Sequence, residues 1–491
     1  MSEQMLPSPS RKGSNPEKIL ISEEMPPSPF RKRPNPEKIL ISEEIRAILG
    51  IYELTRRLRA KDPEDSEDVD KSKEDISESV GDHTAMSAYL MHYFLPILES
   101  AGMKLDYGKT LDMVLAHGIG DINNPSKPGV QKTPEERRQE LVTTAKVFGE
   151  LPRRGGFNRQ MFEAYTEYLG QETSESRFVR AVNGLETMLY VLSRPAHLRA
   201  GLVGGKGYAV EDYRDRIQSY CREFPQLLEF YKRLEPIFHW KDPKTKENYF
   251  APSREYENQI PRPDVLQNVF LSNAPDFGDP TDIDVESENA RLLELYRMKR
   301  QLLFGQEPKP STEYHDTDAE HIASALFLNR YFTPAILADQ EQQGRDELSL
   351  RETTEILLAH DVPEAITGEK IVQAKTAADT VEEKIAAATI ANRYAPRAGG
   401  FNQKFMFSFA KYELGKSDSP APLNAKVAKA IDTMEGQFNL LYLKTRETPA
   451  RMIYMSHEKV DEKSGRFIRM FPIIDDHFEA LNEKFKEVGL F

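Results

Sequence analysis

Histidine and aspartate side chains, the types that bind a divalent metal, recur in the second half of this 491-residue chain. Neutral imidazole suits manganese, iron, cobalt, nickel or zinc, and carboxylates favour the harder ions. We therefore expect manganese, cobalt, iron or nickel, with magnesium or zinc as alternatives. A metal held by such a set can bind a phosphate oxygen and lower the pKa of its own water, which is hydrolytic chemistry. The candidate ligands, in chain order, are His321, His360, Asp361 and Asp432.

Each candidate ligand is a weak signal when taken alone. A lone helical histidine such as His321 is more often a hydrogen-bonded core or surface residue, and adjacent pairs such as His360-Asp361 arise by chance. Asp432 lies among apolar residues in KAIDTMEG, where an unpaired carboxylate is costly to bury. A cation would remove that cost, and so would a salt bridge. It is the joint occurrence of all four, mirrored by a second pattern upstream, that favours a metal site.

The first half of the chain carries an altered copy of the same pattern. Its two histidines, His83 in ESVGDH and His117 in LAHGIGD, precede the later pair at an offset that stays between 238 and 249 residues across the repeat. A duplicated unit of about 200 residues is an ordinary domain size. Gly118 and Asn183 stand where the second copy has its aspartates, which predicts that only the second copy is intact. An altered site built from His83, His117 and Asp121 is the alternative.

Helical periodicity dominates both halves and strand patterns are nearly absent, so we predict an all-α protein. Most of the candidate ligands lie within or at the ends of these helices. The expected helices span residues 82–101, 108–117, 134–150, 158–169 and 174–193 in the first half, and 318–339, 350–360, 376–393, 402–414 and 422–443 in the second.

Composition changes divide the chain into four segments. Residues 1–40 hold most of a near-perfect 20-residue tandem, 5–24 and 25–44, rich in Pro and Ser, which predicts a disordered tail. Residues 41–240 form the first helical domain and residues 286–491 the second. The intervening residues 241–285 are rich in Pro, Asp and Asn and lack sustained periodicity, so we expect a long linker there.

Overall composition restricts the classes of partner and compartment. The net charge of −13 argues against nucleic-acid binding, which depends on clustered Lys and Arg. The chain has one cysteine and therefore no intramolecular disulfide, and it has no apolar run long enough to cross a membrane. It lacks an apolar signal-peptide core as well. We expect a cytoplasmic protein, with a nuclear location as the alternative because of the basic segment 31–33.

The order His…His-Asp…Asp resembles the metal motif of the HD-domain superfamily, whose members are largely phosphohydrolases. Within that superfamily the chain is similar to the HD-domain 5′-deoxynucleotidases. ESVGDH in the first copy resembles the family phrase Glu-Ser-Val-x-Asp-His, and AHDVPEAITGE in the second resembles His-Asp-x-x-Glu-x-x-x-Gly-Asp. The resemblance implies two tandem HD-domain helical bundles, the first of them degenerate.

The resemblance also implies roles for particular residues. The four candidates in the second copy would hold the metal. Glu364 matches a glutamate that handles protons near the scissile phosphate, and Glu369 stands where the family has Asp, which keeps a carboxylate one methylene further out. The implied substrate is a small phosphate ester, a nucleoside 5′-monophosphate, whose phosphorus is attacked in line by water.

Two features depart from the family pattern. The segment before the first histidine, GQEPKPSTEYHDTDAEH, lacks the family's basic-aromatic stretch and leaves Tyr314 or His315 as substitutes. Family members are usually single-domain homodimers, so the duplication implies an intramolecular pseudo-dimer. Further oligomerisation stays open. Two rival functions therefore stay open: a non-catalytic regulatory or scaffold protein that binds metal or nucleotide, and a hydrolase of another small phosphate ester.

Overall fold

The computed structural model describes two helical copies with gaps between and within them. The predicted tail (1–40), the predicted linker (241–285) and most of the helix expected at 134–150 lie outside the described residues. Those described are 80–121, 145, 148, 151–152, 154–193, 217–239, 318–342, 348–367, 376–393, 395–396, 398–416, 421–445, 461–487 and 489. Within these ranges every regular element is a helix, which confirms the all-α prediction.

The first copy consists of helices that begin and end close to the expected residues. The main difference is at the second of them, which continues four residues beyond the expected end, because HGIGD contains no proline to stop it. The elements are α2 (Val80–Ser100), α3 (Tyr107–Asp121), the short 3₁₀ turn η3 (Arg154–Gly156), α5 (Phe157–Gly170), α6 (Ser174–Ser193) and α9 (Pro225–His239).

The second copy repeats this order of elements. The helices expected in this half are all present, with bounds that agree to within a few residues. The elements are α13 (Asp318–Gln342), α14 (Leu350–Ala359), α15 (Glu364–Thr367), α16 (Ala377–Arg393), the 3₁₀ turn η5 (Ala398–Gly400), α17 (Phe401–Gly415), α18 (Leu423–Thr445), η6 (Asp461–Gly465), α20 (Arg466–Ile468) and α21 (Pro472–Glu487).

The duplication extends further along the chain than the sequence patterns indicated. Helices α9 and α21 were not expected, yet both follow a Phe-Pro pair and each packs on the last long helix of its own copy, α6 or α18. Helix α21 buries Ile474, Phe478, Leu481 and Phe485. This spacing of four, three and four residues is that of one helical face.

The repeated Gly-Gly-Phe blocks form the same turn in both copies. Gly155 and Gly156 have φ of 61° and 76°, and Gly399 and Gly400 have φ of 62° and 70°. Glycine adopts this left-handed backbone at little cost, whereas residues with a Cβ are strained there. The blocks are therefore explained by backbone geometry and require no chemical role.

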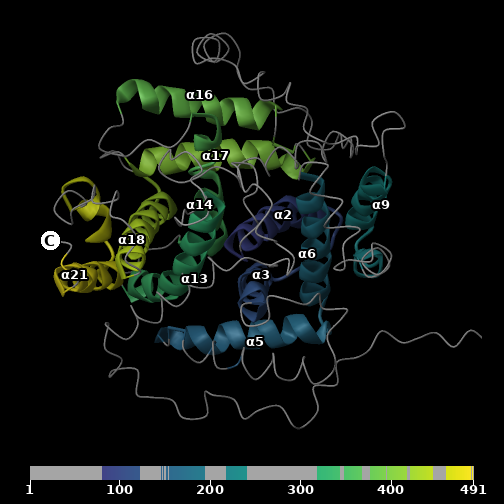
Figure 1. The fold of residues 1–491 in the computed structure, drawn as a ribbon, viewed down its shortest axis with the longest axis horizontal. Coiled ribbons are helices and arrows are strands. Elements are labelled where there is room, and N and C mark those ends of the chain that lie inside the picture. The colour runs from purple at the N-terminus through teal and green to yellow at the C-terminus, as the bar shows by residue number, and fades with distance from the viewer. Residues whose placement is uncertain are drawn as a thin grey trace, which may run out of the picture.

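The two copies pack against each other through α2 and α13, their first described helices. In Figure 1 the equivalent helices α5 and α17 lie on opposite sides of the molecule, with α2, α3, α13 and α14 between them. The buried apolar side chains of both copies form one continuous core. None of the helices described is both long and apolar enough to span a membrane.

Candidate metal centre

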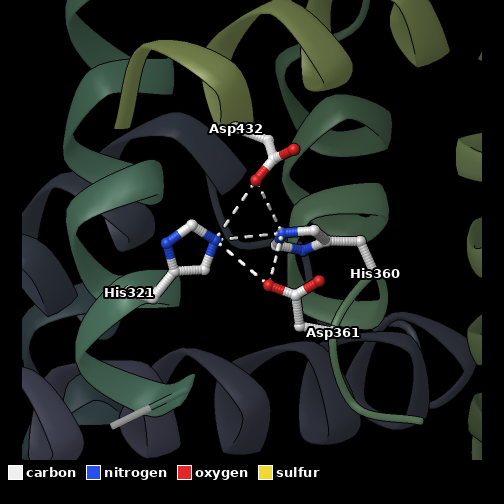
Figure 2. A group of neighbouring side chains, drawn as sticks. All are labelled: His321, His360, Asp361 and Asp432. Atoms are coloured by element: carbon white, nitrogen blue, oxygen red, sulfur yellow. Dashed lines mark hydrogen bonds and ion pairs between the residues drawn. The ribbon is translucent and has the colours of Figure 1, made fainter. Parts of the chain in front are cut away.

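Four side chains from three helices converge on one point in the second copy, as Figure 2 shows. His321 lies in the first turn of α13, His360 caps the C-terminus of α14, Asp361 follows it, and Asp432 lies in α18. One ligand atom from each lies within 4.8 Å of all the others. Among the described residues, no other group of three or more His, Cys, Asp or Glu side chains converges in this way.

The distances between these atoms suit a single ion. Nε2 of His321 lies 3.1 Å from Oδ2 of Asp361, 3.3 Å from Oδ1 of Asp432 and 3.2 Å from Nε2 of His360. Nε2 of His360 lies 3.0 Å from Oδ2 of Asp361 and 3.4 Å from Oδ1 of Asp432. Metal–ligand bonds of about 2.1 Å place neighbouring ligands of one ion roughly 3 Å apart. Two imidazoles and two carboxylates at these distances therefore fit one divalent cation.

Both imidazoles are oriented by hydrogen bonds on the side away from the cluster. Nδ1 of His321 lies 2.5 Å from Oε2 of Glu435, and Nδ1 of His360 lies 2.7 Å from the carbonyl oxygen of Leu357. Because these acceptors need an N–H donor, each Nδ1 carries a proton and each Nε2 can present its lone pair to a cation. Such outer partners fix the tautomer and ring orientation of metal-binding histidines.

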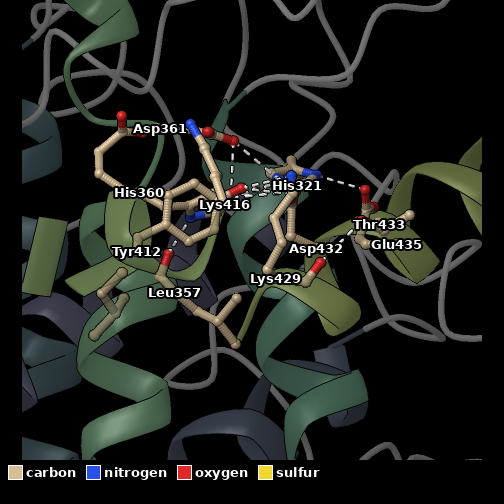
Figure 3. Close-up of polar contacts among 12 residues, drawn as sticks. His321, Leu357, His360, Asp361, Tyr412, Lys416, Lys429, Asp432, Thr433 and Glu435 are labelled. Atoms are coloured by element: carbon tan, nitrogen blue, oxygen red, sulfur yellow. Dashed lines mark hydrogen bonds and ion pairs between the residues drawn. The ribbon is translucent and has the colours of Figure 1, made fainter. Parts of the chain in front are cut away.

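Asp432 is oriented in a similar way by its second oxygen. Figure 3 shows Tyr412 and Lys429 beside this carboxylate. The Tyr412 hydroxyl and the Lys429 ammonium each donate to Oδ2 over 2.6 Å, which leaves Oδ1 directed at the imidazoles. The Tyr412 ring also packs on His360, with the ring centroids 4.9 Å apart. One tyrosine therefore contacts two of the four candidate ligands.

The end of α14 determines where Asp361 points. The helix begins after Ser349, whose side chain accepts a hydrogen bond from the Glu352 amide, and it ends at Ala359. Pro363 has no N–H to donate to the Ala359 carbonyl, so an α-helix cannot continue through this position. The chain leaves the helix at Asp361, and its carboxylate turns toward the two imidazoles.

The acidic side chains around the cluster favour the protonated, positively charged form of both imidazoles. Burial alone would lower the pKa of both imidazoles. The charge of Glu435 and the bonds from Asp361 and Asp432 outweigh burial at His321 and raise its pKa well above the usual value. Asp361 and Asp432 likewise raise the pKa of His360 to about 9. Since a histidine binds metal as neutral imidazole, a cation entering this cluster must displace protons.

The same interactions act on the two carboxyl groups in the opposite sense. Burial would raise the pKa of Asp361 and Asp432. The neighbouring imidazoles, together with Lys429 at Asp432, outweigh it and hold the pKa of both groups far below the usual range. Both aspartates are therefore ionised, as metal ligands must be.

Of the two acids predicted to handle protons, only Glu364 lies among the described residues. Glu364 is the first residue of α15, is 6% exposed, and donates its amide to the Asp361 carbonyl over 2.9 Å. The carboxylate is thus carried by a short helix tied directly to a ligand. Glu369 lies outside the described residues. The proton-handling roles of both stay predictions.

The first copy keeps the outer partners of the two histidines. Nδ1 of His83 lies 2.5 Å from Oε2 of Glu186, and Nδ1 of His117 lies 2.5 Å from the Val114 carbonyl, as in the second copy. Nε2 of His83 and Nε2 of His117 are 2.8 Å apart. Gly118, at the position of Asp361, lies inside α3, which continues to residue 121. The first copy therefore has the hydrogen bonds that orient both imidazoles, although it lacks both aspartates.

Asn183 contacts Tyr168 as Asp432 contacts Tyr412, but the donor and the acceptor are exchanged. Its Nδ2 donates to the Tyr168 hydroxyl over 2.7 Å, whereas Tyr412 donates to Asp432. The side-chain oxygen of Asn183 is buried and has no hydrogen-bond partner in the part of the chain that the structure describes. The aspartate-to-asparagine difference thus keeps the contact with tyrosine but removes the charge that a dication requires.

Sequence reasoning missed the residues that orient the ligands. Glu435 lies three residues after Asp432 on the same helix, and Glu186 stands at the same spacing after Asn183. A repeated i, i+3 acid was thus a readable signal. Tyr412 also lies in a repeated Tyr-containing block. Lys429 stands where the first copy has Arg180, so a repeated cation was a readable signal as well.

Comparison with known proteins supports a relationship at the family level. A family model described as HD domain matches residues 67–198 and 331–473, one segment in each copy and together more than half of the chain. The second segment contains His360 and Asp432 and begins after His321. No curated protein and no solved structure matches the chain.

Proposed function

We propose, because the chain belongs to the HD domain family, that its second copy is a metal-dependent phosphomonoesterase acting on a nucleoside 5′-monophosphate. The observation that carries this proposal is the convergence of two oriented imidazoles and two ionised carboxylates within 4.8 Å. When bound there, a divalent metal supplies Lewis-acid chemistry for phosphate-ester hydrolysis. His321, His360, Asp361 and Asp432 would hold it.

Two lysines near the cluster favour an anionic substrate. Nζ of Lys429 is 5.3 Å from the centroid of the Tyr412 ring, and Nζ of Lys416 is 4.7 Å from it. The Lys416 side chain is 34% exposed, and its ammonium pairs with Oε1 of Glu413 over 2.5 Å. An anionic ligand arriving from solvent would therefore compete with that carboxylate. Figure 3 shows Lys416 extending over the Tyr412 ring toward the metal candidates. Cations beside a metal centre attract and orient a phosphate.

Glu364 and Glu369 are the proposed proton carriers. A water must lose a proton as it attacks phosphorus, and the departing 5′-oxygen must gain one. Glu364 suits this task because it begins a helix tied to Asp361 through a backbone hydrogen bond. We assign the first copy a supporting role without a metal, in an intramolecular pseudo-dimer, because it lacks both aspartates.

One sequence feature favours a second candidate substrate. The segment before His321 contains neither arginine nor tryptophan, the side chains with which similar nucleotidases would contact sugar and base. A hydrolase of another small phosphate ester needs no such contact. The same reaction at the same four ligands would then serve a smaller or differently shaped alcohol.

The decisive experiment compares matched positions in the two copies. Native protein, Asp432→Ala and Asn183→Ala would be loaded with Mn²⁺ or Co²⁺ and incubated with ribo- and deoxyribonucleoside 5′-monophosphates and a panel of other phosphate esters. We expect phosphate release by native protein and Asn183→Ala, and none by Asp432→Ala. Release from other esters alone would replace the nucleotide, and bound metal without any release would indicate a regulatory protein. Absence of bound metal would refute the proposal.

A further inference from the structure

A tyrosine of the first copy reaches the helix that carries two candidate ligands of the second. The Tyr89 hydroxyl, from α2, donates a hydrogen bond to the carbonyl oxygen of Leu358 in α14. Tyr89 is 3% exposed. The contact joins residues 269 positions apart in the sequence and lies at the interface between the copies.

The contact falls where α14 needs hydrogen-bond partners. The last four carbonyls of an α-helix have no N–H donor within the helix, and a buried carbonyl without a partner is costly. Near the end of α14 the Leu357 carbonyl accepts from Nδ1 of His360, and the Leu358 carbonyl accepts from Tyr89. Two adjacent carbonyls are therefore fixed immediately before the ligands His360 and Asp361, one of them by the other copy.

The duplication supplies an internal comparison for this hydroxyl. At the offset that relates His83 to His321, Tyr89 corresponds to Phe327, which has no hydroxyl to donate. The first copy also has no helix end at the matching place, because α3 continues to residue 121. Of the two equivalent positions, only Tyr89 has a hydroxyl, and the helix it faces, α14, ends beside candidate ligands.

The surroundings of Tyr89 keep it a hydrogen-bond donor. Burial, followed by the charges of Asp361 and Asp318, raises the pKa of the phenol well above its usual value. The hydroxyl therefore stays protonated wherever the protein is folded. Phenylalanine at this position would keep the packed ring and remove only the donor.

We propose that Tyr89 is a positioning residue through which the first copy sets the metal affinity of the second. By holding the C-terminal turn of α14, it places His360 and Asp361 at the distances that one cation requires. This inference rests on the proposed function in so far as the cluster binds a metal. It gives the first copy a specific task at a site to which it contributes no candidate ligand.

The test compares Tyr89→Phe with Tyr107→Phe in the full chain. Tyr107 also belongs to the first copy and approaches α14, but at Arg351 and Thr354, away from the helix end that precedes the candidate ligands. Its hydroxyl lies 2.9 Å from Nε2 of His92, and its ring lies 5.5 Å below the Arg351 guanidinium. Mn²⁺ affinity would be measured by chelator competition, and backbone hydrogen exchange would be followed in a peptide covering residues 355–367 of the metal-free protein.

We expect Tyr89→Phe to weaken Mn²⁺ binding about tenfold, the usual scale for loss of an outer partner of a metal site, and to accelerate exchange in that peptide. Tyr107→Phe should bind Mn²⁺ with nearly native affinity and leave exchange at this helix end unchanged. Native affinity in Tyr89→Phe would overturn the inference, whatever the exchange rates. If the native chain binds Mn²⁺ but releases no phosphate, the proposed function fails while the affinity ratio still decides the role of Tyr89. If it binds no Mn²⁺, the inference fails together with the metal site.

Discussion

Tyr93 of the first copy packs edge-to-face against Phe401 of the second, with ring centroids 5.9 Å apart and ring planes at 79°. The equivalent residues make the reciprocal contact, since Tyr331 of the second copy meets Phe157 of the first at 5.6 Å and 86°. The two contacts are equivalent, because Tyr331 is the counterpart of Tyr93 and Phe157 is the counterpart of Phe401. This reciprocity is the signature of a two-fold interface, here formed within one chain.

Aromatic packing behind this interface is duplicated as well. Phe94 meets Phe230 at 5.1 Å and 88°, and the corresponding Phe332 meets His477 at 5.0 Å and 88°. The rings from α2 and α13 are thus held by the late helices α9 and α21 of their own copies. A copy that lost its metal ligands would still be needed as half of this interface.

One polar contact across the interface is expected to contribute strongly to stability. Arg330 of the second copy makes a two-pronged contact with Asp112 of the first, with Nε to Oδ1 at 2.5 Å and Nη2 to Oδ2 at 3.1 Å. Burial raises the pKa of Asp112 to about 6 despite the charge of Arg330, so the pair is fully charged only above that pH. Removing one partner of a buried pair leaves the other uncompensated.

At pH 8 we expect Asp112→Asn and Arg330→Met each to lower the free energy of unfolding by about 3–5 kcal/mol, measured by urea denaturation. The double variant should lose less than the sum, because both single changes break one interaction. Arg159→Met, which breaks an exposed pair with Glu163, is the control and should cost less than about 1 kcal/mol. Additive losses would show that Arg330 and Asp112 are not coupled.

Glu435 should control metal affinity in the second copy although it is not itself a candidate ligand. Glu435→Gln replaces the carboxylate that accepts from Nδ1 of His321, so the imidazole loses its charged anchor. We expect metal affinity to fall about 10- to 100-fold, measured by competition with a chelator. Glu186→Gln makes the same replacement at His83 in the first copy and should leave metal affinity unchanged. Equal losses in both variants would indicate a general effect on folding.

Most of the helices and the four side chains that converge were readable from sequence, because both depend on local pattern. Apolar spacing predicted α6 at its observed bounds, and Pro363 marked the end of α14. The order of histidines and acids identified the four residues that converge, His321 and Asp432 among them, without showing how close they lie. The contact of Tyr89 with Leu358 has no local signal, since the packing of the two copies alone creates it.

His92 is expected to make stability fall in acid. Burial, followed by the charges of Arg351 and Lys404, outweighs the bond to the Ala88 carbonyl and lowers the pKa of His92 to about 3. Its Nε2 faces the Tyr107 hydroxyl at 2.9 Å. The folded state therefore keeps this imidazole neutral, whereas the unfolded chain binds a proton below about pH 6.5. Stability is then lost progressively as the pH falls from about 6.5 toward the folded value.

We expect His92 to contribute a loss of about 1.4 kcal/mol per pH unit between roughly pH 6 and pH 4. Urea denaturation of the native protein and of His92→Gln at several pH values would measure the difference between their slopes, whatever the starting stability of the variant. The variant should show the shallower slope. Parallel slopes would mean that His92 is protonated in the folded state or exposed to solvent.

Restoring a metal site in the first copy should require ending its helix as well as replacing its ligands. Asn183→Asp returns one carboxylate, but an aspartate at position 118 would lie inside α3, which continues to residue 121. In the second copy the helix ends because Pro363 stands at the position of Gly120. We therefore expect Gly118→Asp with Asn183→Asp to bind no second metal until Gly120→Pro is added. Metal analysis in an Asp432→Ala background would isolate the rebuilt site, and binding by the variant without proline would contradict this account of how α14 presents Asp361.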